Sequence, residues 1–108
     1  MPLTHDFRET VKARADREPA FRQALLQEAV ELLLEGDVAI GKALLRDYIN
    51  ATIGFGALSE QVGIPAKSLM RMVSARGNPR SDKLFAMLAC LQKATGVQLA
   101  FSHGKQAA

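Results

Sequence analysis

Five of the chain's 14 lysine and arginine residues lie between residues 67 and 83, and Asp82 is the single acidic residue in that stretch. Ammonium and guanidinium groups at this density are typical of surfaces that contact nucleic-acid phosphates, and an arginine can also donate two hydrogen bonds to a guanine. A run of charge is more often just a solvated face. The assignment to nucleic acid therefore depends on the element that carries these cations, which are Lys67, Arg71, Arg76, Arg80 and Lys83.

The segment from residue 55 to residue 74 has the pattern of two short helices joined by a tight turn. Two helices that cross steeply through a three-residue turn need facing apolar residues, a turn residue that tolerates positive φ, and an apolar anchor after it. Gly63 and Ile64 fill the turn positions, and Pro65 presets φ for the second helix. The facing residues are Leu58, Val62, Leu69 and Met72, with the small Ser59 at the contact. The spacing favours a helix-turn-helix, although an ordinary helical hairpin with a glycine turn remains an alternative.

The outward face of the second helix is slim, polar and basic. It consists of Ala66, Lys67, Ser68 and Arg71, with Met70 at its edge. Such a face can enter a DNA major groove, which is about 12 Å wide. We predict that Arg71 contacts a base and that Arg76, Arg80 and Lys83 contact the sugar-phosphate backbone, since these three follow in the loop and the next helical turn.

The rest of the chain predicts an all-α fold. Apolar residues at helical spacing indicate helices over residues 6–17, from Pro19 to a stop at Gly36, from an Asp37 cap to about Ala51, and from a Ser81 cap to Thr95. In the third of these helices the residues expected to face inward are Ile40, Leu44, Leu45, Tyr48 and Ile49. The tail from Val97 to Phe101 alternates only once and is at most one short strand.

Length and composition limit the classes of function. A chain of 108 residues forms one modest core and leaves little material for a deep enzyme cleft. Cys90, His5 and His103 are too few and too far apart for a metal site or a Cys/His catalytic pair, so we expect no enzyme, no metal and no cofactor. The sequence also shows no secretory signal and no apolar run of membrane-spanning length, which predicts a cytoplasmic protein that does not enter a membrane.

Residues 38–96 resemble the lambda-repressor-like helix-turn-helix domain of the XRE type, which has five short helices. More narrowly, the whole chain resembles the addiction-module antidote proteins, which are HigA-like antitoxins. The blocks that carry the resemblance are Phe7–Val11, Ala24–Ala29, Leu44–Phe55, Gly63–Met72 and Gly77–Pro79. The third and fourth blocks are the specific ones.

The resemblance implies both a function and a set of contacts. Such a protein binds its operator as a homodimer, represses its own operon and neutralises a RelE/HigB-like toxin encoded beside it. The implied base contacts are Ala66, Lys67, Ser68 and Arg71, and the implied DNA-backbone contacts are Phe55, Gly56, Arg76, Asn78 and Arg80. Gly56 stands where many XRE proteins have glutamine, so a phosphate contact there has to come from the main-chain N–H.

The expected organisation is an N-terminal helical extension over residues 1–36, a DNA-binding domain over 37–96 and a C-terminal tail over 97–108. Residues 1–54 carry a net charge of −2 and residues 55–108 a net charge of +5. An acidic N-terminal part suits a basic protein partner such as a toxin. Two alternatives stay open. One is a protein-interaction module that captures a partner through residues 4–35 and binds no DNA, and the other is a plain XRE-type regulator that has no toxin.

The tail is the expected dimer contact. Val97, Leu99 and Phe101 add apolar surface beyond what one small core covers, and a lone strand can pair with its two-fold mate. The alternative is that the tail folds back on the helices of its own chain.

Overall fold

The computed structural model describes residues 5–100, with side chains from Thr10 onward, and in this range the chain forms six α-helices. They are α1 (His5–Arg17), α2 (Pro19–Leu34), α3 (Val38–Ala51), α4 (Phe55–Val62), α5 (Ala66–Met72) and α6 (Ser81–Thr95). The all-α prediction is confirmed for this part of the chain. The short strand predicted from Val97 is not formed over residues 97–100.

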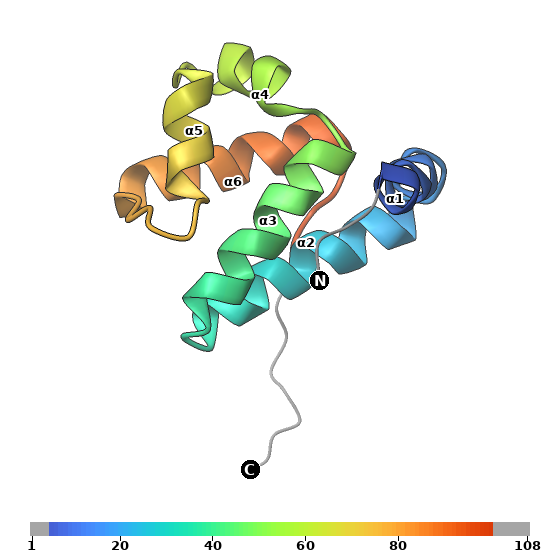
Figure 1. Cartoon of the computed structure of the whole chain (residues 1–108), viewed down its shortest axis with the longest axis horizontal. Coiled ribbons are helices and arrows are strands. Elements are labelled where there is room, and N and C mark those ends of the chain that lie inside the picture. Colours follow the sequence, from blue (N-terminus) through green and yellow to red (C-terminus); the bar gives the residue numbers. More distant parts are fainter. Residues whose placement is uncertain (1–4, 101–108) are drawn as a thin grey trace.

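The helices are arranged in two groups around α3. Helices α2 and α3 form an antiparallel hairpin with α1 lying across the open end, and α4, α5 and α6 gather on the other side of α3 (Figure 1). Gly41 allows the hairpin to close tightly, because a Cβ atom at this position would lie 2.9 Å from side-chain atoms of Leu33. A glycine inside a helix costs about 1 kcal/mol relative to alanine, and here the close packing of two helices offsets that cost.

One hydrophobic core joins the two groups. Its largest fully buried residues are Leu26 from α2, Leu45, Tyr48 and Ile49 from α3, Leu58 from α4, Leu69 from α5, Met87 and Leu91 from α6, and Val73 directly after α5. The boundary expected after residue 36 coincides with the turn between α2 and α3, but the core continues across it. Helix α2 is therefore part of the same packing unit as the helix-turn-helix segment.

Two of the predicted helix caps differ from the structure. Asp37 occupies the N-cap position of α3, but its side chain makes no capping hydrogen bond. Ser81 is the first residue of α6, and Arg80 takes the N-cap position without a side-chain bond. The predicted glycine at the end of α2 is confirmed, since Gly36 has a φ of 91°. Spacing gave the N-cap position of α3 correctly and missed that of α6 by one residue, and a capping hydrogen bond also depends on a rotamer that spacing does not determine.

A polar junction ties the N-terminal helices to the end of α6. The Nε of Arg22 in α2 donates to the carbonyl oxygen of Thr95 at 3.1 Å, and the same guanidinium donates to the carbonyl oxygen of Ala15 in α1. The Tyr48 hydroxyl lies 2.6 Å from the Thr95 hydroxyl. Burial raises the pKa of the Tyr48 phenol, while the hydrogen bond to Thr95 and the charge of Arg22 oppose that rise.

No helix in the described part of the chain combines the length and the apolar run that crossing a bilayer requires.

Candidate nucleic-acid interface

The predicted turn between the two short helices is present. Residues 63–65 connect α4 to α5, and Figure 1 shows α5 running steeply across the end of α4. Gly63 has a φ of 77° and a ψ of 22°, the left-handed conformation that favours glycine, and its N–H donates to the Ser59 carbonyl at 2.9 Å. Pro65 is the N-cap of α5, where its carbonyl accepts the N–H groups of Ser68 and Leu69.

The inner face of the motif is fixed in the core as the spacing predicted. Leu58 and Leu69 are fully buried, and Ile64 and Met72 are each 8% exposed. Val62 is half-buried and packs against the same cluster. Helix α5 has only seven residues, so this packing and not its own length holds it in place.

The outer face of α5 differs in exposure along its length. Lys67 and Arg71 lie one turn apart and are exposed, and Met70 between them is 48% exposed. Ala66 and Ser68 are half-buried, with Ala66 against the core. Among the four predicted base contacts, the two cations therefore project furthest from the protein.

The loop after α5 folds back tightly on the end of that helix. The Ser74 hydroxyl donates to the Arg71 carbonyl at 2.8 Å, and the Gly77 N–H donates to the Ser74 carbonyl at 3.1 Å. A Cβ atom at Gly77 would overlap the carbonyl oxygen of Arg71, so only glycine permits this close approach. Four predicted DNA-backbone contacts follow in or just after this loop and all are exposed, namely Arg76, Asn78, Arg80 and Lys83.

We call the five exposed cations of α5, the loop and the start of α6 the basic face: Lys67, Arg71, Arg76, Arg80 and Lys83. Of these five cations only Arg80 forms an ion pair within the described residues, with Asp82 at 3.4 Å, and both side chains of that pair are largely exposed. Exposed pairs of this kind contribute about 1 kcal/mol or less. The basic face can therefore offer its charge to an anionic partner at little cost.

Lys42 of α3 supports this loop, and sequence analysis missed it. The side chain is only 6% exposed, and its Nζ donates to the carbonyl oxygens of Gly77 at 2.7 Å and Ala75 at 3.5 Å. The available signal was its spacing, since Lys42 lies three and seven residues before the buried Leu45 and Ile49 and so shares their helix face. Ile40, predicted to face inward, is instead 56% exposed.

At the start of α4, the structure limits how one predicted contact could be made. Phe55 is 7% exposed and belongs to the core, so its side chain is not available to a DNA phosphate. Gly56 is exposed, and the first N–H groups of a helix have no partner inside it. Only the main chain at residues 55 and 56 can serve the phosphate contact that the resemblance implies.

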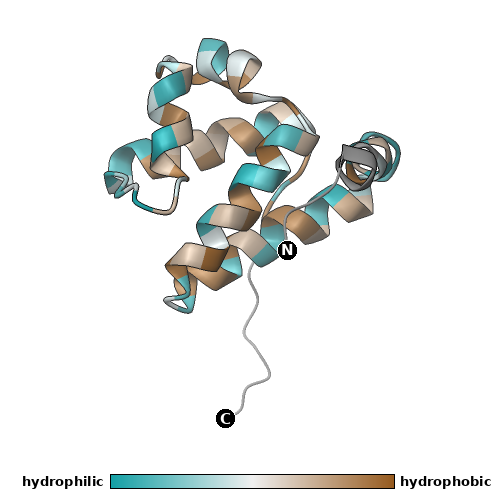
Figure 2. Cartoon of the chain, in the orientation of Figure 1, coloured by the Kyte–Doolittle hydropathy of each residue, from teal (hydrophilic) through white to brown (hydrophobic). Residues whose placement is uncertain are grey.

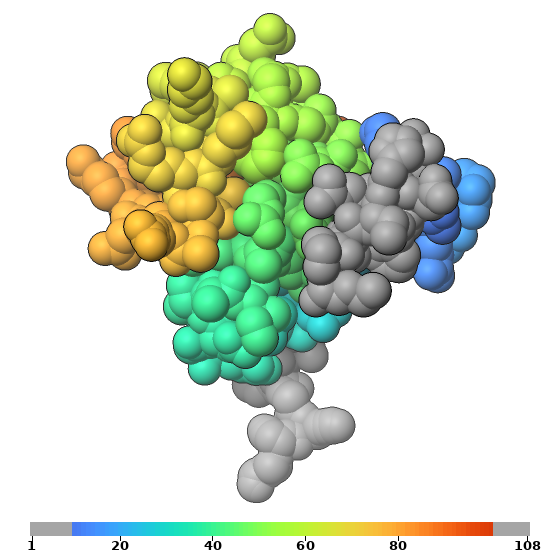
Figure 3. Space-filling view, viewed as in Figure 1, coloured from blue at the N-terminus to red at the C-terminus, as the bar shows by residue number. Residues whose placement is uncertain are grey.

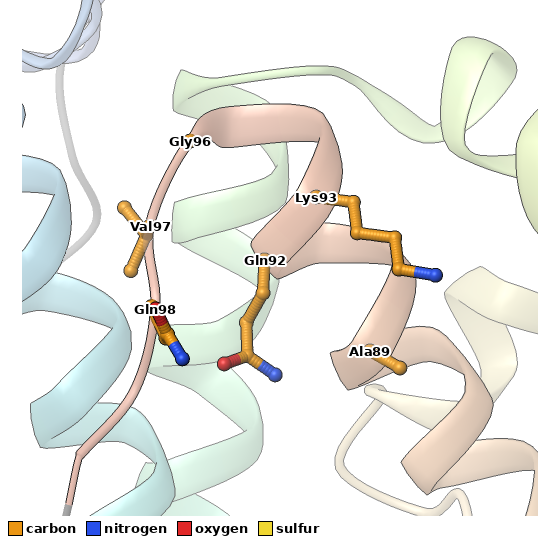
Figure 4. Close-up of a pocket in the computed structure, with 6 residues that line it drawn as sticks. All are labelled: Ala89, Gln92, Lys93, Gly96, Val97 and Gln98. Atoms are coloured by element: carbon orange, nitrogen blue, oxygen red, sulfur yellow. The ribbon is translucent and has the colours of Figure 1, made fainter.

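The described part of the tail follows the alternative that it folds back on the helices of its own chain. Val97 is 4% exposed and packs in the core of its own chain, and Leu99 is partly buried against that core. The Leu99 N–H donates to the Gln92 side chain at 2.8 Å, and the side chains of Gln23 and Gln27 donate to the carbonyls of Gln98 and Ala100. Figure 4 shows residues 96–98 alongside the end of α6. Val97 is therefore covered by its own chain and offers little surface to a second copy. Phe101, the third residue of the predicted dimer contact, lies outside the described residues.

The described residues give little support for a metal site or an enzyme active site. They contain no group of three His, Cys, Asp or Glu side chains placed to hold a metal ion. A shallow hollow beside the tail is lined by Ala89, Gln92, Lys93, Gly96, Val97 and Gln98, among which Lys93 is the one ionisable side chain (Figure 4). Cys90 is half-buried, and its Sγ lies 3.7 Å from the Gln61 side-chain oxygen.

No protein-family model, no curated protein and no solved structure matches this chain.

Proposed function

We propose that this protein binds duplex DNA by placing the outer face of α5 in the major groove. One observation carries the proposal: Lys67 and Arg71 project side by side from a short helix whose opposite face is buried in the core. A helix held in this way presents its cations in a fixed position, so little order has to be gained on binding. Ala66 and Ser68 on the same face are small, so they leave room for the walls of the groove.

The residues of the basic face have two different roles in this proposal. The planar guanidinium of Arg71 can donate to O6 and N7 of one guanine, which discriminates between bases. Lys67 has a flexible ammonium that can reach either a base or a phosphate. Arg76, Arg80 and Lys83 hold the backbone and set the register without reading sequence.

Sequence-specific binding at physiological salt requires more than one such module. A single helix-turn-helix covers few base pairs, so we propose a homodimer on a two-fold operator with half-sites about 34 Å apart. Val97 is buried in the core of its own chain and Leu99 is partly buried against it, so this proposal does not rely on these two residues for the dimer contact.

The regulatory setting follows from the resemblance to HigA-like antitoxins. We propose that the protein represses its own operon and neutralises a RelE/HigB-like toxin, with a plain regulator without a toxin as the alternative. The first test is the gene neighbourhood, where the antitoxin role requires a gene for a small basic protein directly beside this one. Co-expression of the two proteins then tests it, because the antitoxin role requires a stable complex and rescue of growth.

The test of DNA binding is fluorescence anisotropy with duplexes selected from a random pool. We expect the selected duplex to bind more tightly than the unselected pool, and both affinities to fall steeply with salt. The double variant Lys67→Gln/Arg71→Gln should lose the preference for the selected duplex. Lys12→Gln/Lys93→Gln, which neutralises two exposed lysines away from the basic face, is the matched control. Binding that is absent, or equally weakened by the control, contradicts the proposal.

A further inference from the structure

A second exposed surface lies at the turn between α2 and α3. We call it the acidic tip and define it as residues 31–40. Three large apolar side chains of this surface face solvent, Leu34 at 70% exposure, Val38 at 46% and Ile40 at 56%. Figure 2 shows hydrophobic residues on both helices next to the turn, and in Figure 3 this region protrudes at the lower end of the visible face.

The charge of the acidic tip has one sign. Glu31, Glu35 and Asp37 are exposed, and residues 31–40 contain no lysine or arginine. Glu31 accepts a hydrogen bond from Gln27 at 3.1 Å, but none of the three carboxylates forms an ion pair within the described residues. Their negative charge is therefore available to an outside partner.

These three apolar side chains do not contribute to the hydrophobic core of the described fold. The core is complete without Leu34, Val38 and Ile40, none of which belongs to it. Single exposed apolar residues are ordinary on a protein surface. Three of them within seven positions of a tight hairpin, bordered by charge, are instead typical of a protein interaction site.

The charge decides among the classes of partner. Nucleic acid and anionic lipid surfaces are repelled by three unpaired carboxylates. A second copy that docks tip to tip also brings like charges together. A protein with an apolar patch and a basic border is bound favourably, because it buries the apolar side chains of the tip and its cations pair with the carboxylates.

We propose that the acidic tip is a docking surface for a basic protein, which buries Leu34, Val38 and Ile40 and places cations against Glu31, Glu35 and Asp37. The inference deepens the partner-binding part of the proposed function and does not depend on DNA binding. In Figure 1 the tip lies at the bottom and α5 at the upper left, so the two surfaces do not coincide.

The probe is a synthetic amphipathic helix of leucine and lysine, about 14 residues long, the length at which isolated helices begin to form. Titration into labelled protein, followed by two-dimensional ¹H–¹⁵N NMR, should shift resonances of residues 31–40 first, and added salt should weaken the binding. A leucine–glutamate peptide of equal length and a lysine–serine peptide of equal charge are the matched probes. Neither should bind comparably.

The variant Leu34→Ser/Ile40→Ser should weaken the leucine–lysine peptide about tenfold, because two exposed apolar contacts are lost. Met70→Ser/Phe85→Ser removes the other two large exposed apolar side chains and is the matched control. All four residues are surface positions, so thermal unfolding should show that both variants fold.

The proposal is overturned if the peptide does not bind, if the shifts lie outside the tip, or if the control weakens binding equally. Self-association that the tip variant abolishes also overturns it, in favour of a second copy. None of these outcomes bears on DNA binding by α5.

Discussion

The basic face and the acidic tip are built alike but differ in the sign of their charge. Each combines exposed charged groups with exposed apolar side chains, Met70 and Phe85 near the cations, and Leu34, Val38 and Ile40 near the carboxylates. Apolar burial is not directional and favours many partners, whereas charge excludes those of the same sign. The comparison therefore indicates that the two surfaces select partners of opposite charge.

The two surfaces also differ in how they are supported. The basic face lies on a seven-residue helix, a loop and the start of α6, and the loop depends on the bonds from Lys42 and on the close approach of Gly77 to α5. The acidic tip is the closed end of a hairpin of two longer helices that pack directly on each other. Substitutions outside the surface should therefore damage the basic face more readily than the tip.

The largest effect is expected when the three cations after α5 are removed, because DNA binding should then be greatly weakened while the acidic tip is unaffected. In the triple variant Arg76→Gln/Arg80→Gln/Lys83→Gln, affinity for any duplex should fall about 10²- to 10³-fold at 0.1 M salt, with the slope of log K against log salt flattened by about 2.7, because each phosphate contact contributes about 0.9. Anisotropy titrations across a salt series measure both quantities. Peptide binding at the tip should be unchanged.

A triple variant of equal charge change is the control. Lys12→Gln/Arg17→Gln/Lys93→Gln removes three exposed cations of α1 and α6 and so lowers the net charge by the same amount. Its salt slope should stay close to that of the unmodified protein. If both triple variants lose the same affinity, net charge and not the basic face determines DNA binding.

The next largest effect is expected from Arg71, and it tests whether this residue reads a base. Arg71→Ala should cost about 1–3 kcal/mol on the selected duplex and relax discrimination at one base position, since a bidentate contact to guanine is lost. Affinity for unselected DNA should change much less. An equal loss on both kinds of duplex makes Arg71 a phosphate contact instead.

The local parts of both surfaces could be predicted from sequence. The turn glycine at Gly63 and the inward apolar residues of α4 and α5 follow from short-range spacing, because a helix face and a left-handed turn are determined by neighbouring residues. Exposure of the basic face follows for the same reason. Spacing also placed Gly36 correctly at the end of α2.

The parts that could not be predicted depend on contacts between distant segments. Lys42 bonds a loop more than 30 residues further on, and Gln23 and Gln27 bond the tail more than 70 residues further on. Phe55 was assigned from a resemblance, which aligns positions but does not give the direction of a side chain. Ile40 was expected to face inward, but it lies in the first turn of α3, next to the hairpin turn, where no other described helix covers it. Because of this error, the acidic tip was not predicted.

Lys42 offers a smaller test of how the basic face is supported. Lys42→Met keeps the length of the side chain and removes the bonds to Gly77 and Ala75, at a cost of about 1.5 kcal/mol. That loss should raise the rate of tryptic cleavage after Arg76 about tenfold, because the loop opens more often. Cleavage after Arg46, an exposed residue inside α3, reports unfolding of the helix itself. Equal acceleration at both sites would mean that Lys42 stabilises the whole fold and does not position the loop specifically.

The smallest expected effect concerns the core that both surfaces share. Burial raises the pKa of Tyr48 above its ordinary value of 10.0, so the phenol ionises at lower pH in the unfolded chain than in the folded one. Above pH of about 10 the unfolded state then binds fewer protons, and stability falls as the pH rises toward the folded pKa. Tyr48 is the only tyrosine and the chain has no tryptophan, so ultraviolet absorbance follows this single ionisation directly.

Denaturant unfolding at several alkaline pH values measures the corresponding loss of stability. Tyr48→Phe removes the ionisation together with the hydrogen bond to Thr95, so its stability should be lower at neutral pH but should decline less steeply above pH of about 10. The two surfaces should also respond together, because the core containing Tyr48 extends from α2 to α6. NMR signals from residues 31–40 and 67–83 that are lost at different pH values would show that the acidic tip and the basic face unfold as separate units.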